Sequence, residues 1–526
     1  MMWSPKTSTA TLIPRPWGPA VFVGLYVLLI LALRAWSGVV ARRVTRDNLD
    51  RAIRGFGRIL LTVRFLVPAW FAVGLFLLGW GQWIYTLAER WWAPLQVPGI
   101  LLGTFPAFAA WAGLWWSQYP ADRSLREQNL LDELEADIPV HAPPTFRAYF
   151  ASNVRLQLLF TAVPVISILT LRDLFSTAIR LWRPHALGSE AVEFATMLLS
   201  TGVVFVFAPE ILRRVLQTQP LPHSPLRHRL EALCRRVGMR YRDILLWRTQ
   251  NNMGNAAVMG ILPPVRYILL SDLLLERMDD EQIEAVFAHE VGHVVHRHMA
   301  WYVVVILIFI LAVFAIAPFI PQQLPDLAGV PQPVFQEVVL PILGFTTFLI
   351  YFGFLSRRFE RQADVYAARI IESHAQERSG FTGGIRAQGS ATPSIVFPAS
   401  REARTLNPEP ASPLPPSHVG EYGATVFASA LHRVALMNNI PLGPRRRPRR
   451  GGVLRRLTHA LDGVVESLHN WLHGSIHHRM AYLRDLSTDP AATTRFDRFM
   501  LGLYCALLFM LFACAAFVVA SGTPVK

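Results

Sequence analysis

His289, Glu290 and His293 form the pattern His-Glu-x-x-His within a sequence that predicts a helix from Asp280 to Ala300. Residues four apart on a helix share one face, so His289 and His293 can bind the same zinc ion (Zn2+). Zinc lowers the pKa of a bound water to roughly 7. Glu290 is then placed to accept a proton from that water as it attacks a carbonyl, and to pass the proton to a leaving amine. The pattern therefore predicts hydrolysis of an amide bond.

A zinc hydrolase of this kind needs a third protein ligand. His296 is the nearest histidine, but it lies roughly 10 Å along a straight helix from His289, too far to reach the same ion easily. Glu360 and Asp364 are better candidates because they stand one helical turn apart further along the chain. Glu360 can bind the metal while Asp364 orients a ligand histidine from behind. A surface helix of mixed charge would contain the same pair, and only the combination with His-Glu-x-x-His favours the ligand interpretation.

Two of these segments resemble a known family. The run His289–His293, followed by His298, resembles the HExGHxxxxH signature of the type-I CAAX prenyl proteases and the HtpX-like membrane proteases of peptidase family M48. The run Ser356–Asp364 resembles the SRxxExxxD element of the same proteins. The resemblance implies one zinc ion per chain, bound by His289, His293 and Glu360. It also implies that Glu290 is the catalytic carboxylate and that Asp364 stands behind the ligands.

Two further elements extend the resemblance to roughly Pro222 to Leu486. The run Asn255–Gly260 resembles an NAxxxG element, which implies that Asn255 and Ala256 bind substrate. The run His473–Arg479 resembles an HPxxxxR element, with Gly474 where the family usually has proline. By this resemblance His473 and Arg479 assist catalysis, either by stabilising the oxyanion or by fixing the helices of the active site.

The composition is that of a membrane protein. Of 526 residues, 52% are apolar and only 17% are charged. The net charge is +15 and comes almost entirely from arginine, since Lys6 and Lys526 are the only lysines. The arginines cluster at the ends of apolar runs, as expected beside a lipid bilayer. No basic surface with interleaved aromatic residues is evident, so no nucleic acid is expected as a partner.

The predicted fold class is mainly α: a multi-pass membrane protein with about eight transmembrane helices and a gluzincin-type α+β zinc protease lobe. About 20 apolar residues cross a bilayer. One candidate, Leu156–Leu171, is short enough to be re-entrant. The eight candidate spans are Pro19–Leu33, Phe65–Tyr85, Pro98–Trp116, Leu156–Leu171, Ala191–Leu212, Trp301–Ile320, Val334–Leu355 and Phe499–Ser521.

The chain is expected to alternate between membrane and lobe. Residues 1–212 form an N-terminal membrane domain with about five spans, and 213–300 the first half of the lobe with the His-Glu-x-x-His helix. Residues 301–355 hold two more spans, and 356–372 the third-ligand helix. Residues 373–420 form a flexible insert rich in Pro, Ser and Gly, 421–486 the second half of the lobe, and 499–521 the last span.

Local patterns predict the elements of the lobe. Helices are expected at Pro222–Gly238, Val426–Asn439 and Leu454–Arg484. Strands are expected at Asp243–Trp247 and Tyr267–Leu270. A substrate could lie extended along an edge strand of this lobe, held by main-chain hydrogen bonds.

The distribution of arginine predicts the orientation. The segment Arg34–Arg64 is rich in arginine and is placed in the cytoplasm. Alternation of the spans then brings the zinc ligands to the cytoplasmic face of a cell membrane. The preference for arginine over lysine favours a bacterial inner membrane. The basic run Arg445–Arg450 has two open interpretations, a contact with anionic lipid and a solvated linker.

These observations predict a zinc-dependent metalloendopeptidase (EC 3.4.24 class) that acts on peptide or membrane-protein substrates in quality control or processing. CAAX-type processing is an alternative. A membrane scaffold or chaperone with a structural zinc is another, although a structural site has no need of Glu290 and usually has four protein ligands. A transporter is disfavoured because no apolar segment carries paired intramembrane charges.

Overall fold

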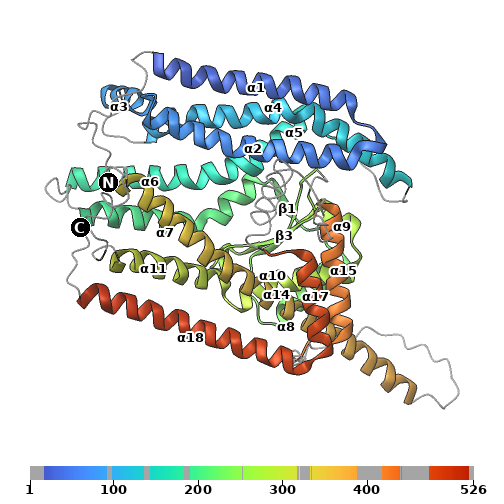
Figure 1. Ribbon diagram of the computed structural model, residues 1–526. Helices are drawn as coiled ribbons and strands as arrows, with labels where there is room; N and C mark the ends of the chain where they lie inside the picture. The colour runs from blue at the N-terminus through green and yellow to red at the C-terminus, as the bar shows by residue number, and fades with distance from the viewer. Residues whose placement is uncertain are drawn as a thin grey trace, which may run out of the picture. The chain divides into compact units, whose positions relative to one another are not determined.

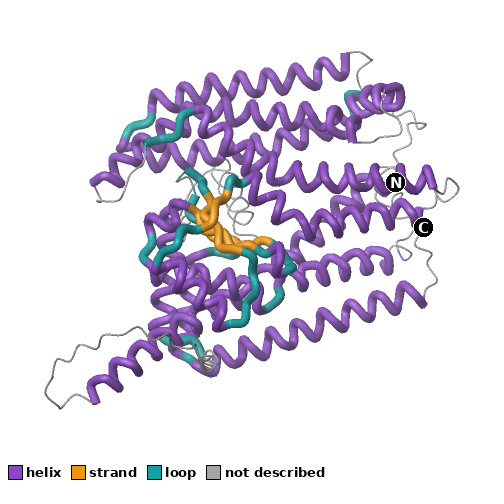
Figure 2. The backbone as a smooth tube through the Cα atoms, turned by 180° about the vertical axis from the view of Figure 1, so that it is seen from behind, coloured by secondary structure: helices purple, strands orange, loops and turns teal. Residues whose placement is uncertain are grey.

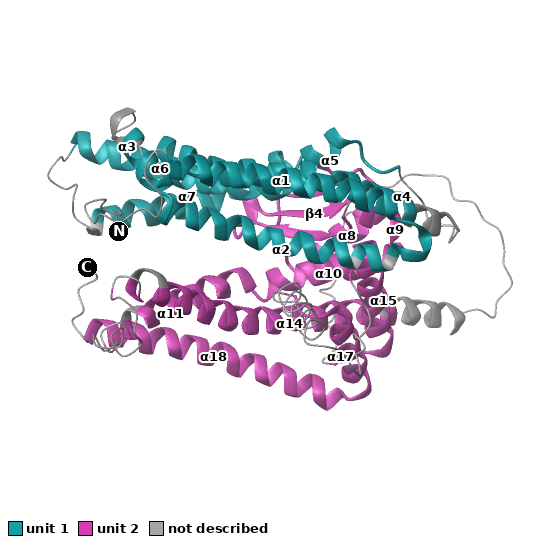
Figure 3. Ribbon diagram, turned by 45° about the horizontal axis from the view of Figure 1, so that its top comes forward, with its two compact units in different colours: residues 1–218, 248–251 teal, residues 219–247, 252–526 magenta. Residues whose placement is uncertain are grey.

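The computed structural model divides into two compact units, coloured separately in Figure 3. Unit 1 comprises residues 1–218 and 248–251, and unit 2 comprises residues 219–247 and 252–526. Each unit is described by itself. The residues that the structure describes are 17–91, 97–135, 142–182, 190–250, 253–316, 319, 332, 335–387, 418–438, 440 and 473–520.

Unit 1 is built from helices (Figure 1). Phe22 and Tyr26 on the first helix are buried in a cluster with residues of α2, α3 and α4. The Tyr26 hydroxyl donates a hydrogen bond to the Val67 carbonyl on α2. The elements are α1 (Trp17–Arg43), η1 (Arg46–Asn48), α2 (Leu49–Phe76), α3 (Trp80–Trp91), α4 (Val97–Glu135), α5 (Phe146–Asn153), η2 (Val154–Leu159), α6 (Phe160–Trp182) and α7 (Glu190–Val215).

Unit 2 combines a small sheet with helices (Figure 2). The strand order is β1-β2-β4-β3, with β2 parallel to β4 and β3 antiparallel to β4. The strand β3 therefore lies at an edge. The strands are β1 (Thr218–Pro220), which crosses the unit boundary, β2 (Asp243–Trp247), β3 (Ala256–Met259) and β4 (Tyr267–Ser271). The two predicted strands are thus present, β2 with the predicted bounds.

The main core of unit 2 joins the sheet to helices and includes Leu230, Ile268, Phe287, Phe359 and Phe427. These residues come from α8, β4, α10, α14 and α15 in turn, so the core joins distant parts of the chain. The helical elements are α8 (Pro225–Arg236), η4 (Pro263–Val265), α9 (Asp272–Arg277), α10 (Asp280–Val295), α11 (His298–Ile316), η6 (Phe335–Val339), α14 (Leu340–Ala387), α15 (Glu421–Met437), α17 (Ile476–Thr488) and α18 (Pro490–Ala520).

Seven helices in the described part of the chain are long and apolar enough to cross a membrane, and the bent pair α10–α11 would make eight. The prediction of a mainly helical multi-pass membrane protein is confirmed. The seven segments are Trp17–Arg43, Arg51–Phe76, Val97–Gln128, Phe146–Trp182, Val192–Val215, Leu340–Gln376 and Pro490–Ala520.

The bounds of the predicted spans differ from those of the observed helices, and at two spans the difference has an identifiable cause. The predicted span Phe65–Tyr85 crosses the break between α2, which ends at Phe76, and α3, which begins at Trp80. Gly79 lies in this break and has a left-handed φ of +76°. The prediction Leu156–Leu171 is too short, because a continuous helical segment runs from Phe146 to Trp182. Arg172 and Asp173 ended the apolar pattern there. Asp173 is nonetheless buried, and it accepts a hydrogen bond from the Val97 N–H at the start of α4.

The helix α10 begins and ends at identifiable signals. Asp279 caps its first turn and forms a reciprocal capping box with Gln282. The helix ends at Val295 rather than continuing to Ala300 as predicted, because Arg297 adopts a left-handed conformation with φ +55°. The next helix, α11, departs at 48°.

Close packing against α14 explains why α10 has a glycine, Gly292, in its middle. A Cβ atom there would lie 3.2 Å from the Ala363 Cα and 3.1 Å from a ring carbon of Tyr366, both on α14. The glycine therefore permits close approach of α10 to α14.

The helix α14 contains both Glu360, the predicted third ligand, and a candidate membrane span. The predicted boundaries at 355, 356 and 372 do not coincide with breaks in the helix, which continues to Ala387. No proline occurs between Ser373 and Pro393 to interrupt the backbone hydrogen bonds. The rest of the predicted insert up to residue 417 lies outside the described residues.

The later elements differ modestly from expectation. The helix predicted at Val426–Asn439 is α15, which starts earlier, at Glu421. Most of the helix predicted at Leu454–Arg484 lies outside the described residues, and α17 covers its end, from Ile476 to Thr488. The basic run Arg445–Arg450 also lies outside the described residues.

Candidate metal centre and active site

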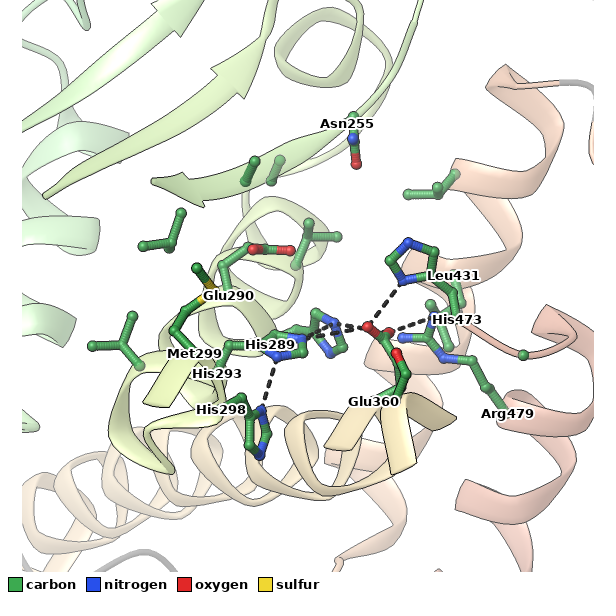
Figure 4. Close-up of a pocket in the computed structure, with 18 of the residues that line it drawn as sticks. Asn255, His289, Glu290, His293, His298, Met299, Glu360, Leu431, His473 and Arg479 are labelled. Atoms are coloured by element: carbon green, nitrogen blue, oxygen red, sulfur yellow. Dashed lines mark hydrogen bonds and ion pairs between the residues drawn. The ribbon is translucent and has the colours of Figure 1, made fainter. Parts of the chain in front are cut away.

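Three side chains from two helices converge at one point in unit 2 (Figure 4). His289 and His293 project from α10, and their Nε2 atoms are 3.2 Å apart. Glu360 projects from α14. Its Oε2 lies 3.6 Å from the Nε2 of His289, and its Oε1 lies 3.7 Å from the Nε2 of His293. The spacing of four on α10 and the close approach of α14 bring the three together.

These distances fit a zinc ion. Zinc binds nitrogen and oxygen at about 2.0–2.1 Å with tetrahedral geometry, which separates neighbouring ligand atoms by about 3.3 Å. The donor set of two imidazoles and one carboxylate is one that zinc accepts in hydrolases with an open fourth position. Among the described residues, His289, His293 and Glu360 form the one group of three or more His, Cys, Asp or Glu with metal-binding spacing. Glu360 and His289 are both buried.

Asp364 and Arg479 stand behind His289. The Asp364 Oδ1 lies 3.0 Å from the Nδ1 of His289, slightly off the hydrogen-bonding line. Arg479, on α17, donates two hydrogen bonds to Asp364, of 2.8 and 2.5 Å, and lies 3.4 Å from Glu360. Burial opposes the charge of Arg479, but the carboxylates of Asp364 and Glu360 raise its pKa above the usual value. The guanidinium is therefore a fixed cation that holds two acidic side chains.

Glu290 occupies the opposite side of the histidines, toward the sheet (Figure 4). Being next to His289 in α10, it points away from the ligand face and toward β3. Desolvation raises the pKa of this carboxyl to about 7, and a backbone hydrogen bond from Val258 partly offsets that rise. A carboxylate with a pKa near neutrality can both accept and return a proton.

His473 approaches Glu360 from the loop before α17. Its Nδ1 lies 2.9 Å from the Glu360 Oε1, and this hydrogen bond raises the pKa of His473 above its usual value. The side chain remains 67% exposed, so it can reach a ligand in the pocket as well as Glu360. Gly474, at φ +74°, occupies the left-handed region. Proline cannot adopt that φ, so the departure from the family element has a local structural reason.

The metal centre forms part of the wall of a pocket of about 870 Å³ within unit 2. Asn255 and Ala256 line this pocket, as do Glu290, His473 and Arg479. The predicted site residues are therefore brought together, with Asp364 directly behind them. Phe427 is a wall residue that the sequence reasoning missed. It lies on α15 and stacks on His289, with the two ring centroids 5.7 Å apart. Nothing in its local sequence distinguishes it from an ordinary core phenylalanine.

Comparison with known proteins gives matches in the same part of the chain. Residues 220–396 match Peptidase family M48. Over 149 residues the chain is 32% identical to the Protease HtpX homolog of Aeropyrum pernix, covering 27% of this chain and 44% of that protein. Over 191 residues it is 24% identical to the CAAX prenyl protease 1 homolog of Arabidopsis thaliana, covering 34% and 44%. The chain thus spans less than half the length of the curated relatives it matches.

A solved structure also aligns with the chain. The crystal structure of S. mikatae Ste24p matches with a TM-score of 0.35 and 13% identity, over 89% of this chain and 99% of that one. The family match and the relatives support the predicted relationship: residues 220–396 of this multi-pass membrane chain match peptidase family M48.

Proposed function

We propose that the chain is an integral-membrane zinc metalloendopeptidase that binds one Zn2+ through His289, His293 and Glu360. The observation that carries the proposal is the position of Glu290. This carboxyl belongs to the residue next to His289 in α10 and lines the same pocket as the three candidate ligands, whereas a purely structural metal site would have no use for it. The family match at residues 220–396 supports the same reaction class.

Each residue has a distinct part in the proposed hydrolysis. When bound, zinc supplies a Lewis acid that polarises the scissile carbonyl and acidifies water. Glu290 takes the proton of the attacking water and delivers it to the leaving amine. His473, exposed at the pocket and hydrogen-bonded to Glu360, is positioned to stabilise negative charge on the carbonyl oxygen. Arg479 is a positioning residue, because its guanidinium is occupied by Asp364 and Glu360.

The edge strand β3 supports an extended peptide as substrate. The strand pairs with β4 on one side and ends the sheet order on the other. Its residues Ala256 and Val258 line the same pocket as the histidines. A peptide added along this edge would place a carbonyl over the ligands while main-chain hydrogen bonds hold it, and Asn255 lies at the start of that edge.

Membrane-associated proteins are the proposed substrates. The pocket is also lined by Met299 and Tyr302 of α11 and by Phe352 of α14, and both helices run into apolar stretches. The pocket therefore shares two helices with candidate membrane spans, which favours substrates that are associated with the bilayer. The proposed location is a bacterial inner membrane, which rests on the preference for arginine over lysine. The proposed cytoplasmic position of the site rests on the arginine-rich segment Arg34–Arg64. Quality control or processing is the proposed role.

The test measures metal content and proteolysis of the detergent-purified full chain. Wild type should hold one zinc ion and cleave an unfolded substrate such as casein, or itself. Glu290→Gln should retain zinc and lose activity by roughly 10²–10⁴-fold. Glu360→Ala should lose both zinc and activity, because the metal would keep only two protein ligands.

The matched control is Glu281→Gln, which changes the same side chain in the first turn of α10, outside the pocket lining. It should retain zinc and activity. The proposal fails if wild type binds zinc but cleaves nothing, or if Glu290→Gln cleaves as well as wild type.

A further inference from the structure

A chain of buried polar contacts runs from His293 to the C-terminal helix. The Nδ1 of His293 lies 2.8 Å from the Nδ1 of His298, the first residue of α11 (Figure 4). The Nε2 of His298 lies 3.0 Å from the Oε1 of Gln362 on α14. The hydroxyl of Tyr504, on α18, donates a hydrogen bond to that same Oε1. His298 is completely buried and Gln362 nearly so, so water does not substitute for these contacts.

The contacts assign the hydrogen atoms. A carbonyl oxygen only accepts hydrogen bonds, so His298 must carry its hydrogen on Nε2 to bond Gln362. The Nδ1 of His298 is then an acceptor, and the hydrogen between the two rings must sit on the Nδ1 of His293. The Nε2 of His293, which faces His289 and Glu360, is left with a free lone pair. That is the form of imidazole that binds a metal.

The opposite orientation of the Gln362 amide gives the opposite result. Its NH₂ group would donate to the Nε2 of His298, which would move the hydrogen of His298 to Nδ1. His293 would then have to accept on Nδ1 and carry its hydrogen on Nε2, where it would block the metal. Metal binding therefore requires the Gln362 oxygen to face both His298 and Tyr504.

The break between α10 and α11 makes the contact between the two histidines. On a continuous helix, residues five apart point in directions about 140° apart, so residue 298 would face away from His293. The left-handed Arg297 ends α10 and redirects the chain. The ring of His298 is then held by Phe359 of α14, which stacks on it at 4.6 Å and 6°.

We propose that His298, Gln362 and Tyr504 form a positioning relay that fixes the tautomer of His293 and makes α18 part of the metal centre. The inference rests on the proposed zinc function. The inference goes beyond that function by assigning roles at the metal site to Gln362 and Tyr504. Gln362 lies 64 residues from its partner His298, and Tyr504 lies 142 residues from its partner Gln362. Both side chains act through His293, without touching the metal or the substrate.

The experiment measures zinc affinity of the full chain in detergent by competition with a chromophoric chelator. Gln362→Met keeps the side-chain length and removes the acceptor oxygen, so zinc affinity should fall by roughly 10–100-fold. Tyr504→Phe removes one hydroxyl, so it should weaken zinc by about 3–10-fold, toward the lower end of such effects.

The matched control is Tyr351→Phe. Tyr351 is also a partly buried tyrosine packed in the same cluster of α11, α14 and α18 as Tyr504, and its hydroxyl has no hydrogen-bond partner among the described residues. Its zinc affinity should equal that of wild type. An equal loss in the control would attribute the effect to loosened packing and overturn the relay.

A second readout needs no metal. Nitrogen-15 NMR of histidine-labelled, metal-free chain should show the hydrogen of His293 on Nδ1 in wild type and a mixture of tautomers in Gln362→Met. Wild-type zinc affinity and an unchanged tautomer in Gln362→Met would overturn the relay. Absence of zinc binding by wild type would instead overturn the proposed metal function, so the two failures are distinguishable.

Discussion

The two histidines of α10 that we propose as zinc ligands are supported in opposite ways. His289 faces the carboxylate of Asp364, which is itself held by the buried guanidinium of Arg479. His293 faces a neutral sequence of His298, Gln362 and Tyr504. One support uses charge and the other uses hydrogen-bond direction, although both include a side chain of α14, Asp364 in the first and Gln362 in the second.

The difference separates two requirements of a metal ligand. Asp364 raises the basicity of His289 and would favour its binding to a cation, but it costs the burial of a charged pair. The neutral relay adds no charge and fixes only which nitrogen of His293 carries hydrogen. The charged support connects to α17 in the lobe, and the neutral one connects to α18, a candidate membrane span. The lobe and the span are thus each linked to one ligand.

The largest expected effect comes from removing the cation of the charged support. Arg479→Met would leave Asp364 and Glu360 as buried carboxylates without their partner, a loss of about 3–5 kcal/mol in the free energy of unfolding. Arg479→Lys keeps the charge but not the two-pronged geometry, so its loss should be smaller. Chemical unfolding of the metal-free chain in detergent measures both. Wild-type stability in Arg479→Met would show that the ion pair contributes nothing net.

A double-mutant cycle tests whether the two supports are independent. Asp364→Asn and Gln362→Met should each weaken zinc by roughly 10–100-fold. They contact different histidines, so the double variant should lose the product of the two factors, within a coupling of about 0.5 kcal/mol. Chelator competition on the four proteins gives the answer. A double variant no weaker than the worse single one would mean that both act through one shared distortion of α14.

The comparison also shows why one support was easier to predict from sequence than the other. Asp364 follows Glu360 by one helical turn, so this spacing together with the His-Glu-x-x-His pattern marked it, and Arg479 entered through a resemblance. Gln362 lies between Glu360 and Asp364 in the sequence, but no spacing rule connects a glutamine to a tyrosine 142 residues later. His298 was noticed only as part of a family pattern. Its role depends on the turn at Arg297, where a continuous helix was predicted.

The fold shows the same division. Apolar length indicated the membrane helices, because burial in lipid requires it of every span. Their ends were missed where polar residues are satisfied by distant groups, as at Asp173 beside the Val97 N–H. Strand β2 was predicted by its own apolar pattern. The position of β3 at the sheet edge, which matters most for a substrate, is set by pairing with β4 and could not be read from its four residues.

The smallest expected effect concerns a charged pair of similar chemistry in a more exposed place. Arg227 on α8 bonds Glu231 and also Asp243 on β2, but these side chains are more exposed than those at the metal centre. The hydrogen bond from Arg227 lowers the pKa of Glu231 below its usual value. A lowered carboxyl pKa contributes stability above the unfolded pKa, and that stability is lost as pH falls through the folded value.

Glu231→Gln should therefore reduce the free energy of unfolding at pH 7 by about 0.2–1 kcal/mol, several times less than Arg479→Met. The difference from wild type should shrink steadily as the pH is lowered below about 4.3, where the unfolded carboxyl becomes protonated. Unfolding curves of both proteins between pH 7 and pH 3 measure this. If Glu231→Gln lost as much free energy of unfolding as Arg479→Met, burial would not explain why the Arg479–Asp364 pair is expected to matter more. If the loss in Glu231→Gln stayed the same at low pH, the ion pair would not be its cause.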